Sequence, residues 1–188
     1  MKIRAAGCLL ALALALSACE KVPMAPAKVA GAEEPANLTF QGFKIRSSHD
    51  GKMVWEAEAV RAKVFQQVNK AQAEEVTLTY FQNGRKVSQV WADHADMNLK
   101  DHDVKARGHV IVKGRNGVVL TTSQLDWDNE TQQATSPAQV TVKRHGTTVT
   151  GWGMRADRSL NDVQILSNVQ AEADNVDDLR HAGDGLRP

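Results

Sequence analysis

The densest set of residues able to do chemistry lies between positions 93 and 103. It holds four aspartates and two histidines: Asp93, His94, Asp96, Asp101, His102 and Asp103. Carboxylate oxygens and imidazole nitrogens are common ligands of divalent metals. On a strand, however, Asp93 and His94 face opposite sides, and positions 101–103 read as a polar loop. The pattern favours a solvated hairpin end over a metal site, and we predict that the chain holds no metal.

Two smaller sets could support hydrolysis. Ser47, His49 and Asp50 are the residue types of a catalytic triad, but neighbours in sequence do not converge on one substrate atom. Glu56 and Glu58 could form a glycosidase-like carboxylate pair, although alternation along a strand puts both on the polar outer side. The sequence contains no Gly-x-Ser-x-Gly elbow and no phosphate-binding glycine loop. We therefore predict no catalytic residues, no enzymatic activity and no cofactor.

The elements that would position such residues are marked by four dipeptides that end in glycine. These are Asp50-Gly51, Asn83-Gly84, Asn116-Gly117 and His145-Gly146, with their glycines 33, 33 and 29 residues apart. Asn-Gly and Asp-Gly between β-rich stretches are the strongest short-range signal for a hairpin with a type I′ turn. The regular spacing predicts one hairpin unit repeated about every 30 residues.

The stretches between these turns alternate with period two, as in strands with one apolar and one polar face. The apolar positions expected to line an interior are Val76, Leu78, Val110, Val112, Leu120, Leu125, Val140, Val142 and Val149. The segment from Glu56 to Glu75 also fits a helix by composition. The alternation Trp55-x-Ala57-x-Ala59 favours a strand there, with a loop near Lys70.

Four tryptophans stand near the same place in successive units: Trp55, Trp91, Trp127 and Trp152. Three of them are followed four residues later by alanine, and Trp127 is displaced by two positions. Tryptophan can act as a stacking platform for sugars. The repeated position favours instead an equivalent structural role, in which each indole fills the core and its N–H reaches a partner.

The N-terminus predicts export. Lys2 and Arg4 precede an apolar run over residues 5–16, which is too short for a span of ~20 residues and suits a signal peptide. The run ends in Leu16-Ser17-Ala18-Cys19, which resembles the lipobox of bacterial lipoproteins. That resemblance implies a signal peptide over residues 1–18 and a lipid anchor on Cys19. The alternative is an ordinary signal peptide with a coincidental cysteine.

The rest of the chain divides by composition. Residues 19–36 are rich in Ala and Pro and are expected to form a tether, residues 37–173 a single β domain, and residues 174–188 a flexible tail. Without residues 1–18 the chain has 21 basic and 22 acidic residues, a net charge of about −1. A nucleic-acid binder would show a basic face, so we expect no nucleic-acid partner.

The residues together carry a family resemblance. The anchored start, the segment Gly-Phe-Lys-Ile-Arg over residues 42–46, the Trp-x-x-x-Ala spacing and the stretch 108–122 resemble the LptC family of lipopolysaccharide export. The resemblance covers roughly residues 38–173. It implies an all-β fold, an open twisted β-jelly-roll of antiparallel strands. One departure is that LptC proteins commonly keep an uncleaved membrane helix where this chain has a lipobox.

The resemblance also implies a function and partners. Such a protein receives lipopolysaccharide from an inner-membrane ABC transporter of the LptB/LptF/LptG kind, holds its acyl chains between two sheets, and passes it to an LptA-like periplasmic protein. The expected site is the apolar interior given above, on the periplasmic face of a membrane, more plausibly the inner one. The expected partner edges carry Phe43 and Ile45 on one side and Val163 and Ile165 on the other. Two alternatives stay open: a structural adaptor with a closed β core, and a sugar-binding jelly roll.

Overall fold

The computed structural model describes residues 36–174 and 186–187. This part of the chain contains strands and no helix. The strands are β1 (Leu38–His49), β2 (Lys52–Phe65), β3 (Lys70–Gln82), β4 (Arg85–Asn98), β5 (Val104–Gly114), β6 (Val119–Asp128), β7 (Gln133–Arg144), β8 (Thr147–Asp157), β9 (Val163–Ala173) and β10 (Leu186–Arg187). The all-β prediction is confirmed.

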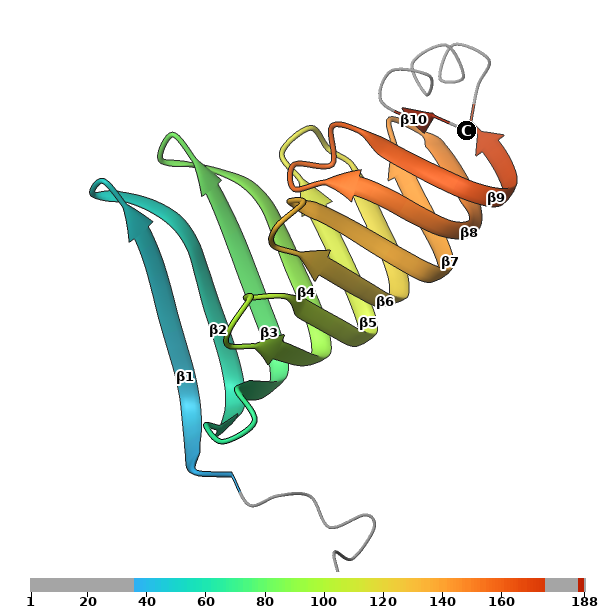
Figure 1. The fold of residues 1–188 in the computed structure, drawn as a ribbon. Helices are drawn as coiled ribbons and strands as arrows, with labels where there is room; N and C mark the ends of the chain where they lie inside the picture. The colour runs from blue at the N-terminus through green and yellow to red at the C-terminus, as the bar shows by residue number, and fades with distance from the viewer. Residues whose placement is uncertain (1–35, 175–185, 188) are drawn as a thin grey trace, which may run out of the picture. The chain divides into compact units, whose positions relative to one another are not determined.

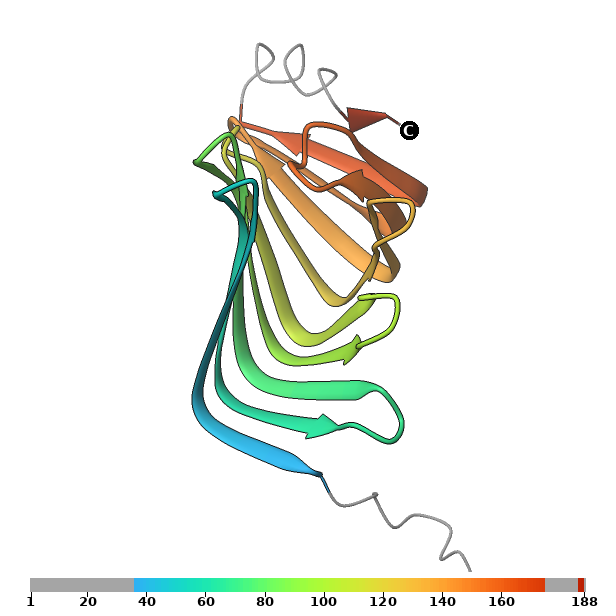
Figure 2. The same cartoon turned by 60° about the vertical axis from the view of Figure 1, so that its left-hand side comes forward.

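The strands form one sheet in the order in which they occur along the chain, from β1 to β10 (Figure 1). Strands β1 to β9 pair antiparallel with their neighbours, and the short β10 pairs parallel with β9. This is an open β-jelly-roll, as predicted. The two sheets implied by the resemblance are instead a single sheet whose strands bend (Figure 2).

The glycine dipeptides form the turns at one end of the sheet. Both residues of Asp50-Gly51, Asn83-Gly84 and His145-Gly146 have positive φ, between 44° and 77°, as a type I′ turn requires. The type I′ prediction is wrong for Asn116-Gly117. There only Gly117 has positive φ, at 81°, and Gly117 N donates to the carbonyl of Gly114 in a longer loop between β5 and β6.

The turns at the opposite end of the sheet are longer and each holds one non-glycine residue with positive φ. These residues are Asn69, His102, Gln132 and Leu160. The segment from Glu56 to Glu75 forms parts of β2 and β3 and the turn before Lys70, so the strand interpretation is correct and the helix alternative is wrong. Each interval of about 30 residues is therefore one complete up-and-down pair of strands.

A line of β-bulges crosses the sheet near the middle of the strands. Between β4 and β5 the pairing skips from Trp91–Ile111 to His94–Arg107, and similar register shifts occur between the later strands. Bulges bend a strand and increase its twist. Pro137, which cannot donate to a ladder, lies in the skipped part of β7. The strands bend sharply near their middles in Figure 2, so that one face of the sheet becomes a concave inner face.

The hydrophobic core lies on this inner face and is not spread evenly along the sheet. Its contiguous cluster draws on β4 to β9 and on the loops that join them, and it includes Leu120, Val140 and Val142 with no exposed surface. Strand β1 contributes no buried residue, and the inner side chains Val76 and Leu78 of β3 are half-buried. Side chains on the inner face are therefore buried against one another towards β9, whereas those towards β1 remain accessible to solvent.

Candidate functional site

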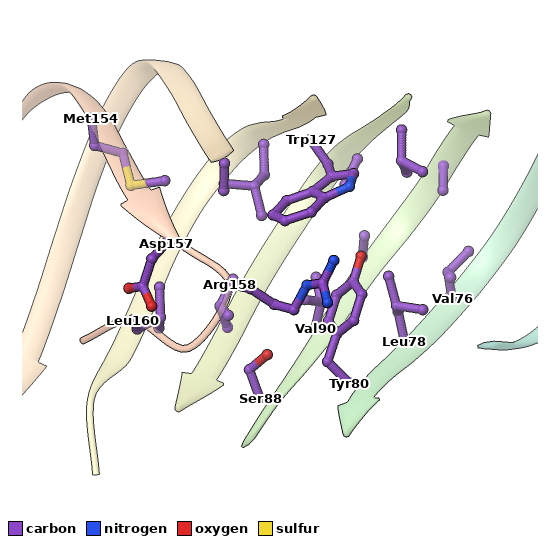
Figure 3. Close-up of a pocket in the computed structure, with 17 residues that line it drawn as sticks. Val76, Leu78, Tyr80, Ser88, Val90, Trp127, Met154, Asp157, Arg158 and Leu160 are labelled. Carbon is purple, nitrogen blue, oxygen red and sulfur yellow. The ribbon is translucent and has the colours of Figure 1, made fainter. Parts of the chain in front are cut away.

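The strongest candidate site is a cavity on the inner face, which we call the inner cavity. It encloses about 60 Å³ and is lined almost entirely by apolar side chains from β3 to β6, with contributions from β7, β8 and the β8–β9 loop (Figure 3). Val76 and Leu78 of β3, Val90 of β4, Val112 of β5 and Leu125 of β6 form its walls. These positions share one face because successive side chains of a strand point to opposite faces of the sheet.

The predicted lining residues fall into two groups. Val76, Leu78, Val112 and Leu125 line the inner cavity. The other five are buried in the core cluster beside it and do not line the cavity: Val110, Leu120, Val140, Val142 and Val149. A ligand would reach this second group only if the packed part of the sheet opened.

The inner cavity is closed on one side by an arginine on two aromatic rings. The guanidinium carbon of Arg158, in the β8–β9 loop, lies 4.9 Å from the ring centre of Tyr80 and 5.1 Å from that of Trp127. The two rings are themselves in contact, 5.8 Å apart between centres. Burial raises the pKa of Tyr80 to about 12, although the nearby Arg158 charge opposes the shift. The phenol is thus neutral at any physiological pH.

Sequence reasoning missed this group apart from Trp127. Tyr80 could have been found, because it stands two and four positions beyond Leu78 and Val76 on the same face of β3. Arg158 and the buried Leu160 lie in a turn, where alternation gives no information about which side chains point inward.

The tryptophans do not share one role, so that prediction is wrong. Trp127 lines the inner cavity, and Trp55 pairs with Tyr80 on the same inner side. Trp91 instead lies in a shallow outer groove, with the Lys113 ammonium 5.2 Å from its ring centre, and Trp152 is 49% exposed. The bulges change the inward parity along the strands, and equal spacing in sequence therefore does not mean equal sides of the sheet.

The candidate metal ligands do not converge. Asp93 pairs with His109, Asp96 with Lys70, and the Asp103 carboxylate accepts the backbone N–H of Asn129. Asp101 accepts from the side chain of Asn98 within the β4–β5 turn. In the residues that the structure describes, no group of three His, Cys, Asp or Glu side chains is arranged to hold a metal ion.

The candidate catalytic residues lie on the surface. His49 Nε2 lies 3.4 Å from an Asp50 carboxylate oxygen at the β1–β2 turn, and both side chains are more than four-fifths exposed. Glu56 and Glu58 of β2 lie across from Lys44 and Arg46 of β1, with Lys44 Nζ 3.2 Å from Glu56. The hydrogen bond from Arg46 lowers the pKa of Glu56 despite partial burial. These carboxylates pair two strands, and neither set lines the inner cavity.

The two edges of the sheet differ. Strand β1 pairs only with β2 in the described part of the chain, and Ile45 is exposed while Phe43 is half-buried beside Phe40. On β9, Val163 and Ile165 are buried in the core, and β10 pairs with Val163 and Gln164. The expectation of an open edge is therefore wrong at Val163. The part of β9 beyond Gln164 pairs only with β8 among the described residues.

The fold and the site together define a class: an open β-jelly-roll, antiparallel from β1 to β9, with a mostly apolar interior and, among the described residues, an edge strand β1 and most of β9 without a further partner strand. A family model described as lipopolysaccharide-assembly, LptC-related matches residues 5–174, and the chain belongs to this LptC family. No curated protein matches the chain. The family is one of lipopolysaccharide transport components that face the periplasm in the cell envelope, and not one of enzymes. No helix among the described residues is long and apolar enough to cross a membrane.

Proposed function

We propose that this protein binds lipopolysaccharide on the inner face of its bent sheet and transfers it along an envelope export bridge without chemical change. The observation that supports this most is that burial of the inner side chains decreases along the sheet from β9 to β1. The inner face is mostly apolar, its contiguous core cluster draws only on β4 to β9, and Val76 and Leu78 of β3 stay half-buried. An apolar surface left partly in water inside a concave sheet is suited to an acyl chain.

The inner cavity must widen to accept such a ligand. At about 60 Å³, its volume is small beside that of an acyl chain. Each methylene buried there would contribute about 0.8 kcal/mol. Movement of β1 to β3 is the least costly route to opening, because these strands give nothing to the contiguous core cluster.

The partners follow from the edges. An unpaired edge strand can add a strand from another protein through main-chain hydrogen bonds. Strand β1 and the part of β9 beyond Gln164 offer such edges in the described chain. We assign them to the two neighbours in the bridge, an LptB/LptF/LptG-like ABC transporter and an LptA-like periplasmic protein.

Photo-crosslinking tests the lipid-binding role. A benzophenone amino acid at Leu78, which lines the inner cavity, is expected to crosslink to lipopolysaccharide in membranes. Thr77 is the matched control, because it is the neighbouring residue on the same strand and points to the other face. If Leu78 yields no crosslink while the protein is folded and membrane-bound, the adaptor with a closed core is the better description.

The anchor is a separate proposal. Cys19 and the predicted signal peptide 1–18 lie outside the described residues, as does the predicted tether 19–36 apart from residue 36. We propose that Cys19 carries the lipid and holds the domain at the periplasmic face of the inner membrane. A Cys19→Ser variant is expected to leave the membrane fraction. Continued anchoring of that variant would show that the N-terminal segment itself is the membrane anchor.

A further inference from the structure

We infer that Arg158 is the residue that recognises the anionic group of the bound lipid, a phosphate attached next to the acyl chains. This inference rests on the proposed lipid-binding function and adds a specificity-determining residue to it. The starting observation is that a guanidinium lies in the wall of a cavity lined mostly by apolar side chains (Figure 3).

Arg158 has no carboxylate partner in the described chain. The other charged side chain lining the inner cavity is Asp157, and its two oxygens accept the backbone N–H groups of Ser159 and Asp162, at 3.2 Å and 2.9 Å. Figure 3 shows the Asp157 carboxylate turned away from the guanidinium. Asp157 therefore shapes the loop and does not neutralise Arg158.

The guanidinium also has unused hydrogen-bonding capacity. One terminal nitrogen donates to the side-chain oxygen of Gln132, and the Nε atom is buried without any hydrogen-bond partner. A buried donor without an acceptor is costly, and it marks a place where a ligand atom can be gained. Cation–π attraction to the faces of Tyr80 and Trp127 stabilises the guanidinium in its apolar surroundings.

The loop fixes the arginine at the border between apolar and polar surroundings. Leu160 lines the cavity and is only 3% exposed. Its backbone carbonyl accepts a hydrogen bond of 2.9 Å from the Asn116 side chain. The β8–β9 loop is thus held both by the buried Leu160 side chain and by the hydrogen bond to Asn116. A phosphate fits this position, because the planar fork of arginine donates two parallel hydrogen bonds to its oxygens.

The test uses the full-length chain in nonionic-detergent micelles, with the benzophenone amino acid at Leu78 and radiolabelled lipopolysaccharide. Unlabelled lipopolysaccharide and its dephosphorylated form compete for crosslinking. A charged hydrogen bond supports a preference of about tenfold or more for the phosphorylated competitor. Arg158→Met is expected to bring the two competitors within about twofold of each other, while the dephosphorylated lipid competes as it does in the wild type.

Two variants control for the fold. Arg155→Met removes an exposed arginine of β8 that does not line the inner cavity, and it should keep the wild-type preference. Arg158→Lys keeps the charge without the planar fork and should show an intermediate preference for the phosphorylated lipid. This variant also tests the inference if Arg158→Met does not fold. Thermal unfolding of each variant reports the fold independently.

The outcomes separate this inference from the proposed function. If the two unlabelled lipids compete equally well against crosslinking of the wild type, the role of Arg158 is refuted and lipid binding stands. If the labelled lipopolysaccharide does not crosslink to the wild type, the proposed function itself fails. Inorganic phosphate should not compete at the lipid concentrations used. Competition by phosphate alone would show that Arg158 binds free phosphate, not the phosphate of the lipid, and would overturn the inference.

Discussion

At the scale of single residues, Asp93 shows how a side chain that suggests metal chemistry instead stabilises a bulge. Its Oδ2 accepts the backbone N–H of His109 at 3.0 Å and lies 2.7 Å from His109 Nδ1. A Cβ atom added to Gly108 would lie 2.3 Å from the same oxygen, so only glycine fits beneath the carboxylate. The Gly108–His109 pair and Asp93 form the bulge between β4 and β5.

Gly108→Ala is therefore expected to destabilise the protein by about 2–3 kcal/mol, because it combines a φ of +92° with the clash against Asp93. Gly42→Ala is the matched control. Gly42 has a φ of +64° with nothing within 4 Å of the added atom, so only backbone strain remains, about 1 kcal/mol. Urea unfolding measures both. Equal losses would mean that the Asp93 contact has no energetic role.

The same contact predicts a pH dependence. The hydrogen bonds from His109, first from its backbone N–H and then from its ring, lower the pKa of Asp93 below its usual value. A carboxylate with a lowered pKa in the folded state stabilises the fold above its unfolded pKa of about 4 and loses that effect as the pH falls through the folded value. The stability advantage of wild type over Asp93→Asn should shrink below about pH 4. Urea midpoints at a series of pH values measure it, and a constant difference down to the acid limit contradicts the assignment.

At the scale of elements, alternation predicts strands well and their bends poorly. The Val-x-Val positions of β5 and β7 face inward as expected, because regular pleating connects them. On β4, Trp91 faces outward and Ala92 inward; beyond the bulge Ala95 also faces inward, although it is three positions from Ala92. The register skip between β4 and β5 causes this change of parity. Gly108 inside an apolar strand pattern was the available signal for it.

The two parts of the sheet should also differ in their response to truncation of valine. Val142 of β7 has no exposed surface and belongs to the core cluster, whereas Val76 of β3 is half-buried. Val142→Ala is expected to cost about 2 kcal/mol of folding free energy, and Val76→Ala about 0.5 kcal/mol. Chemical denaturation of both variants checks this. Similar costs would show that β3 is packed as tightly as β7 and would weaken the case for an opening interior.

At the scale of the whole molecule, the strand order could be predicted because chain order and sheet order are the same in a succession of hairpins. The regular glycine turns carry that information locally. Two features could not be predicted, since they depend on contacts between distant residues. One is the pairing of β10 with β9, in a segment expected to be a flexible tail. The other is the placement of Arg158 against Tyr80, which lies 78 positions earlier in the chain.

Uneven packing along the sheet leads to a prediction about dynamics. Local opening is easiest where few apolar side chains are buried, and hydrogen exchange reports its free energy. Strands β5 to β8 hold most of the core cluster, and β1 has no buried residue. Amides of β5 to β8 should exchange slowest and those of β1 fastest. Added lipopolysaccharide should slow exchange chiefly in β3 and β4, whose Leu78 and Val90 line the inner cavity. Uniform protection along the sheet, unchanged by the lipid, would indicate a rigid core and favour the adaptor role over the carrier.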